Sequence, residues 1–103
     1  MPKIEYPVYR GVICGELQGS ATALQLPDIA CSWVVLKARS DNAGSVYIGK
    51  AAVTKADGTT DTTTGFELAP GESTPVLELD NLKRLYRICD NAGDDLTYLG
   101  AKA

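Results

Sequence analysis

The sequence predicts an all-β fold, a single β-sandwich or jelly-roll-like domain of about eight short antiparallel strands. Glycine and proline divide the 103 residues into short segments that are rich in β-branched and aromatic side chains. No stretch keeps the apolar period of an amphipathic helix. Because a chain of this length accommodates one hydrophobic core, residues 1–103 are predicted to form one domain.

The expected strands follow one another along the whole chain and are separated by turn residues. Successive side chains of a strand point to opposite sides of a sheet. Lys37 and Arg39 mark the outer side of one strand, so Val34, Leu36 and Ala38 are predicted to face the core. The same alternation predicts core positions at Phe66, Leu68, Leu77 and Leu79. The strands are expected at residues 9–17, 22–26, 31–39, 45–50, 65–69, 74–79, 84–89 and 96–100.

Local turn signals agree with this architecture. Asp57–Gly58 suits a tight turn with positive φ, and Pro70–Gly71 suits the central positions of a type II turn. Residues 55–65 have almost no apolar side chains and are predicted to form an exposed loop or arm. A short helical turn is expected over residues 80–83, with Asp80 as its N-cap.

One short motif occurs twice. Asp-Asn-Ala-Gly follows a predicted strand at residues 41–44 and again at residues 90–93. The repetition indicates two equivalent hairpins in which Asp or Asn caps the turn and Gly takes a strained dihedral angle. An equally good interpretation is that two unrelated hairpins use the same favourable turn residues.

The chain is predicted not to be an enzyme. The sequence has no histidine, which is the commonest general base and a member of most Ser and Cys nucleophile systems. It contains no phosphate-binding glycine motif, and no cofactor is expected. The carboxylate pairs Asp57 with Asp61 and Asp94 with Asp95 fall in turn-rich segments, where acidic residues are ordinarily solvated.

Metal binding and thiol chemistry are not expected either. Oxygen ligands for calcium are offered by Asp90, Asn91, Asp94 and Asp95, but their spacing does not fit a calcium-binding loop, so a turn is preferred and no metal site is predicted. The chain has three cysteines without C-x-x-C spacing, which are predicted to be buried and reduced: Cys14, Cys31 and Cys89.

Charge and hydropathy exclude two further classes of partner. The net charge is −3, and the ten Lys and Arg residues are spread along the chain. A nucleic-acid-binding surface needs clustered cations, so no nucleic-acid partner is expected. No apolar run has the length of a membrane span or a signal peptide, so synthesis in a cytosol and no membrane partner are expected.

Outward positions of the strand at 31–39 predict a contact surface. Trp33 and Val35 fall on the side opposite to the predicted core, and an outward Trp beside a Val is more than a solvated sheet needs. A loop, an arm or a partner is therefore expected to cover them.

Three segments resemble one family of proteins. They are Trp33-Val34-Val35-Leu36-Lys37-Ala38 with the following Asn42, Gly44 and Val46 to Gly49, then Gly65 to Ser73, then Asn81 to Ile88 with Gly93 to Leu99. Together they cover about two thirds of the chain and resemble small β-sandwich virion proteins of tailed bacteriophages, which decorate capsids or form the bases of head and tail fibres. The motifs are strand and turn signatures and carry no catalytic residue.

The resemblance implies a non-enzymatic structural protein of a phage particle, made in the host cytoplasm and located in the virion. It implies a capsid decoration or stabilising subunit that contacts copies of itself, as a trimer rather than a dimer, and a major capsid or other virion protein. Under the same resemblance residues 1–8 are expected to form an extended N-terminal arm over a neighbouring subunit, and Tyr6 and Tyr9 are candidate interface residues beside Trp33 and Val35. The alternative is a carbohydrate- or receptor-binding module of a phage fibre, with its site on the loops at residues 40–45 and 56–65. That alternative would use exposed rings among Tyr6, Tyr9, Trp33, Tyr47, Tyr86 and Tyr98 for stacking, whereas in the other interpretation the strand tyrosines pack across strands.

Overall fold

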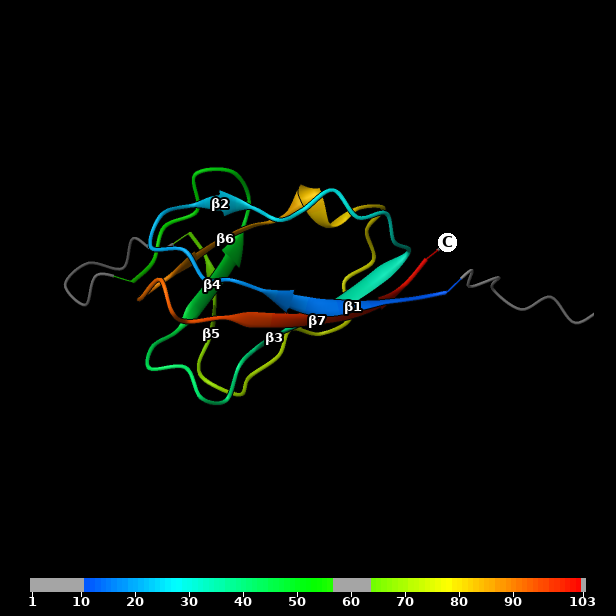
Figure 1. Cartoon of the computed structure of the whole chain (residues 1–103). Coiled ribbons are helices and arrows are strands. Elements are labelled where there is room, and N and C mark those ends of the chain that lie inside the picture. The colour runs from blue at the N-terminus through cyan, green and yellow to red at the C-terminus, as the bar shows by residue number, and fades with distance from the viewer. Residues whose placement is uncertain (1–10, 57–63, 103) are drawn as a thin grey trace, which may run out of the picture.

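The computed structural model describes residues 11–56 and 64–102, and its strands form two antiparallel sheets (Figure 1). The first sheet has three strands in the order β1 (Val12–Leu17), β7 (Leu96–Ala101) and β3 (Trp33–Ala38). The second has four in the order β2 (Leu24–Gln25), β6 (Tyr86–Cys89), β4 (Val46–Gly49) and β5 (Phe66–Leu68). The predicted all-β class is confirmed, and the arrangement is consistent with a small β-sandwich.

The core lies between the sheets and is built by alternating side chains. Val34, Leu36 and Ala38 of β3 are completely buried, as the sequence predicts. From the second sheet Val46, Ile48, Leu68 and Cys89 are buried in the same cluster. Leu77 and Leu79 are half-buried and pack against this cluster.

Phe66 is an exception, because its side chain is 58% exposed and the prediction of a core position is wrong. β5 pairs only with β4, so it is an edge strand of the second sheet in the described part of the chain. Phe66 borders a hollow that also contacts Pro75 and Leu77, and there the described residues leave the sandwich open on one side.

The expected strand at residues 74–79 does not form a regular strand. The segment runs beside β3 but joins it only through isolated bridges, Val34 with Leu77 and Lys37 with Ser73. Two residues lie between the bridges on β3 and three on the other segment, so one residue is extra there. Pro75 lies between the bridges and has no N–H to donate, and both features interrupt a regular ladder.

The repeated Asp-Asn-Ala-Gly turns do not belong to hairpins, which corrects the prediction. The turn at 41–44 leads from β3 in the first sheet to β4 in the second, and the turn at 90–93 leads from β6 in the second sheet to β7 in the first. The link from β1 to β2 also changes sheet. These three crossovers gather at one end of the molecule, and the ends of the described chain lie at the other (Figure 1). The fourth link that changes sheet, from β2 to β3, lies outside this group (Figure 1).

Among the remaining expectations, the type II turn is confirmed, since Gly71 has φ of 86° and the N–H of Glu72 donates to the carbonyl of Ala69 at 2.9 Å. The helical turn is a 3₁₀ helix, η1 (Leu82–Arg84), and its N-cap is Asn81 rather than Asp80, because the Asn81 side chain accepts from the Lys83 N–H. Asp57–Gly58, residues 1–8 and most of residues 55–65 lie outside the described residues.

Candidate functional site: an apolar sheet face and a polar clasp

The outer face of the first sheet carries adjacent apolar side chains from all three strands. The register places Cys14, Leu99 and Val35 side by side across the sheet, and we call such a set of paired residues a row. Two residues along the strands, a second row consists of Val12, Ala101 and Trp33. Side chains two residues apart in a strand point to the same face of the sheet. The side chains of these two rows therefore point to the face opposite to that of the buried Val34 and Leu36. We define the apolar face as Val12, Cys14, Trp33, Val35 and Leu99.

Solvent reaches a large part of this face. Val12 is 69% and Leu99 50% exposed, Cys14 is exposed, and Trp33 and Val35 are half-buried. The small residues Gly100 and Ala101 leave a shallow hollow of about 370 Å³ between Val12 and Trp33. Trp33 and Val35 point to the outer face of the sheet, as predicted. Tyr6 and Tyr9 lie outside the described residues.

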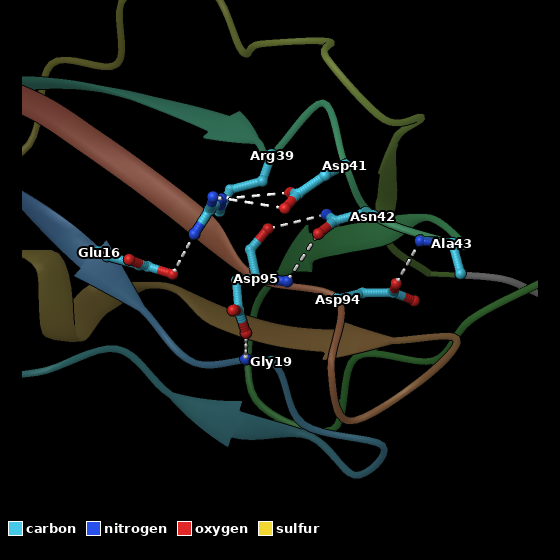
Figure 2. Close-up of polar contacts among 8 residues, drawn as sticks. All are labelled: Glu16, Gly19, Arg39, Asp41, Asn42, Ala43, Asp94 and Asp95. Carbon is cyan, nitrogen blue, oxygen red and sulfur yellow. Dashed lines mark hydrogen bonds and ion pairs between the residues drawn. The ribbon is translucent and has the colours of Figure 1, made fainter.

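At the end of the sheet where the three crossovers lie, the same outer face carries polar residues. The next outward row is Glu16, Thr97 and Lys37. Arg39 follows β3 and donates from Nη1 to Oε1 of Glu16 at 2.8 Å, and its Nε lies 3.2 Å from Oδ1 of Asp41 (Figure 2). The hydrogen bond to Glu16 and the charge of Asp41 raise the pKa of Arg39. The face thus passes from apolar to charged along its strands.

The crossovers at that end are held by a second group of polar residues, which we call the clasp: Asn42, Asp90, Asn91, Asp94 and Asp95. Asp94 is 1% exposed and lies at its centre. Its Oδ1 accepts from the N–H groups of Ala43 at 3.0 Å and Gly44 at 3.1 Å. Its Oδ2 accepts from the N–H and the side-chain amide of Asn91 at 2.9 and 3.0 Å.

These donors decide the charge state of the buried acid. Burial by itself raises the pKa of Asp94, but the hydrogen bonds from Gly44, Asn91 and Ala43 outweigh it, and the pKa is lowered. Asp94 is therefore a carboxylate that the folded chain stabilises near neutral pH.

The other clasp residues join the remaining connections. Asn42 and Asp95 bind each other twice, with the Asn42 side-chain amide donating to the Asp95 carbonyl at 2.8 Å and the Asp95 N–H donating to Asn42 Oδ1 at 2.9 Å. Asp95 Oδ1 also accepts from the Gly19 N–H at 2.9 Å (Figure 2). Asp90 accepts from the Ser45 N–H at 2.9 Å. Three of the four sheet-to-sheet links, β1 to β2, β3 to β4 and β6 to β7, are thereby tied together.

The clasp explains two sequence features. The first Asp-Asn-Ala-Gly copy and the adjacent Ser45 supply backbone N–H groups, whereas the second copy and the adjacent Asp94 supply the carboxylates that accept them, so the copies are not equivalent. Neither Gly44 nor Gly93 has a positive φ, which corrects the expected strained dihedral angle. Gly44 is instead required by close approach, because a Cβ there would lie 2.7 Å from Cβ of Asp90.

The oxygen-rich cluster at Asp90, Asn91, Asp94 and Asp95 thus has an assigned structural role. In residues 11–56 and 64–102 no group of three or more His, Cys, Asp or Glu side chains is arranged to hold a metal ion. Cys31 and Cys89 are buried as expected, and burial is the main cause that raises the pKa of each thiol. Cys14 is exposed on the apolar face, so the prediction that it is buried is wrong.

The aromatic residues do not form one platform in the described structure. Trp33 and Tyr98 belong to the first sheet, whereas Tyr47 and Tyr86 belong to the second. Tyr47 is only 3% exposed, and its hydroxyl lies 3.3 Å from Glu67 Oε2.

The chain matches no family model, no curated protein and no solved structure. The site is therefore interpreted from its own geometry. Within the described residues no helix is long and apolar enough to cross a membrane.

The sequence predicted the outward positions of Trp33 and Val35 but not those of Val12 and Leu99, which depend on the register of β1 and β3 with β7.

Proposed function

We propose that the protein is a non-enzymatic structural subunit of a bacteriophage particle, a capsid decoration or stabilising protein that acts through protein–protein contacts. The observation that carries the proposal is the apolar face of the first sheet. A contiguous apolar surface with charged residues at its border has the anatomy of a protein interface, in which an apolar centre is surrounded by a polar rim.

The rest of the described chain supports a structural role. The sequence has no histidine, and the polar side chains of the clasp, with the buried Asp94 at its centre, are engaged in holding the crossovers. The clasp connects three of the sheet-to-sheet links by hydrogen bonds and so fixes one end of the sandwich. The outer face of the first sheet is therefore held as a rigid surface. The particle context comes from the resemblance of residues 33–38, 42, 44, 46–49, 65–73, 81–88 and 93–99 to small virion proteins of tailed phages.

The proposed partners are copies of the same chain and a capsid or other virion protein. The apolar face suits such contacts, because it is formed by regular strands rather than by loops. Strand residues change little in position on binding, so a preformed face loses little conformational freedom when it is covered.

The proposal is tested by locating the protein in an infected culture. Particles of a phage that carries this sequence are separated on a density gradient, and the chain is quantified in each fraction by mass spectrometry. We expect it to sediment with the particles at a constant ratio to the major capsid protein through a second gradient. Recovery of the chain only in the soluble fractions, or a ratio that falls to zero on repurification, would contradict the proposal.

A further inference from the structure

We propose that the apolar face binds a second copy of this chain, related to the first by a two-fold axis that is parallel to β7 and lies midway between the two facing sheets. The inference rests on the proposed function, since it names one partner of the surface through which the subunit acts. The inference follows from the order of side chains on the face. That one rotation places apolar residues opposite apolar residues and an acidic residue opposite a basic one.

The geometry begins with the central position of β7. The sheet order is β1, β7, β3. A half-turn about an axis parallel to β7 and midway between the two copies therefore places the two outer strands of one copy opposite the exchanged outer strands of the other. It also places each row of side chains opposite the same row of the second copy. Two sheets that pack face to face lie about 10 Å apart with their strands roughly aligned. In such a pair β1 of each copy faces β3 of the other.

The rows then meet in chemically matched pairs. Val12 lies opposite Trp33 of the second copy, and its side chain faces the hollow beside Trp33. Leu99 lies opposite its own equivalent at the axis. In the polar row Glu16 lies opposite Lys37, and the symmetry makes this ion pair twice. Within the described residues Lys37 has no carboxylate in ion-pair range, so it is available for this contact.

Other arrangements fit the same face less well. A two-fold axis across the strands would place β1 over β1 and reverse the rows, so that Glu16 meets Val12 and Lys37 meets Trp33. Lys37, which has no ion pair within the described residues, would then be buried against an apolar side chain without a partner. Pairing of the free edges of β1 would leave Trp33 and Leu99 in solvent. The charge pattern therefore selects the axis along β7.

The size of the face sets the strength of the contact. Three strands about 4.8 Å apart and six residues long at about 3.4 Å each give a flat area of roughly 290 Å². Stable interfaces bury about 800 Å² on each partner, so the two-fold pair is expected to be weak and to form in the micromolar to millimolar range. A weak pair of this kind can exchange for another partner during assembly.

Charge exchange tests the register directly. Purified wild-type chain, Glu16→Lys, Lys37→Glu and the double variant are compared by sedimentation velocity up to about 1 mM. Each single variant places like charges opposite each other twice, and we expect its dimer dissociation constant to rise at least about tenfold. The double variant, and an equimolar mixture of the two single variants, re-form both ion pairs and are expected to associate like the wild type.

A matched control separates register from net charge. Lys50→Glu makes the same charge change as Lys37→Glu at an exposed position next to β4, in the other sheet. Labelled Glu16→Lys protein is titrated with Lys37→Glu and with Lys50→Glu, and tighter binding to Lys37→Glu is expected. Equal binding, a mixture that fails to restore association, or a wild-type chain that stays monomeric at about 1 mM would overturn the inference. The gradient experiment on particles decides the proposed function separately, because incorporation into a particle does not need self-association.

Discussion

Replacing Asp94 by asparagine removes a buried carboxylate that four N–H groups hold at the centre of the clasp. Asparagine has nearly the same shape, but only its oxygen accepts hydrogen bonds. Whichever way the amide is turned, two of the four donors then face another donor. The variant therefore tests whether the clasp determines the stability of the sandwich.

The magnitude follows from the two lost bonds. Hydrogen bonds to a charged group contribute about 1.5 to 3 kcal/mol each, so Asp94→Asn is expected to lower the free energy of unfolding by about 3 to 6 kcal/mol. A domain of this size has a total stability of about 5 to 15 kcal/mol. With about 4 to 8 °C for each kcal/mol, the melting temperature should fall by at least about 12 °C.

The assay is urea unfolding followed by Trp33 fluorescence, with thermal melting by circular dichroism. Asp41→Asn is the control, because it makes the same chemical change at an exposed Asp of the Asp-Asn-Ala-Gly copy at residues 41–44. Asp41 is largely exposed, and among the described residues its side chain pairs with Arg39 alone, so its variant should differ from the wild type by less than about 1 kcal/mol. A loss below about 1 kcal/mol for Asp94→Asn, or an equal loss for Asp41→Asn, would refute the reasoning.

Acid titration adds a second readout of the same carboxylate. The pKa of Asp94 is lower in the folded chain than its ordinary value of 3.8, so the folded state favours the ionised form. This contribution to stability is complete above about pH 4 and is lost as the pH falls from there through the folded-state pKa. Asp94→Asn should lack this part of the acid dependence, whereas Asp41→Asn should keep it.

Two further predictions concern the thiols and the centre of the first sheet. A thiol reagent should modify one cysteine of the native chain, Cys14, and mass spectrometry should find Cys31 and Cys89 labelled only after unfolding; rapid native labelling of Cys89 would contradict its burial. Gly100→Ala should lower stability by about 1 to 3 kcal/mol, since its Cβ would collide with the carbonyl oxygen of Trp33 on the neighbouring strand. Gly93→Ala is the control, because a Cβ there meets nothing within 4 Å, and equal melting of the two variants would count against the tight approach of β3 to β7.

Local rules predicted the parts of the fold that local chemistry decides. The charges of Lys37 and Arg39 were enough to orient β3, and Val34, Leu36 and Ala38 are buried as that orientation requires. The Pro70–Gly71 turn was predicted because only a few residue types suit its dihedral angles.

Features that depend on distant parts of the chain were not predictable in the same way. The alternation that buries Leu68 also predicted burial of Phe66, but Phe66 lies where the edge of the second sheet is uncovered. Nothing in the Asp-Asn-Ala-Gly copies distinguishes a hairpin from a crossover, because the difference lies in which sheet the next strand joins.

The candidate site shows the same division. Trp33 and Val35 were found from alternation within a single strand. Val12, Cys14 and Leu99 joined them only through the register of three strands, and a one-residue slip of β7 would have turned Leu99 inward.

The apolar face is tested most directly by placing a charge at its centre and measuring incorporation into particles. Leu99→Lys introduces an ammonium group into the middle of the face, and Leu24→Lys makes the same change at a similarly exposed leucine of the other sheet, 47% against 50% exposed. Tagged wild-type and variant chains are supplied to a phage that lacks its own copy, and the amount per purified particle is measured. We predict at least about a tenfold loss for Leu99→Lys, because a buried unpaired charge is costly in an interface, and wild-type levels for Leu24→Lys. Wild-type incorporation of a folded Leu99→Lys chain would contradict the role assigned to the face.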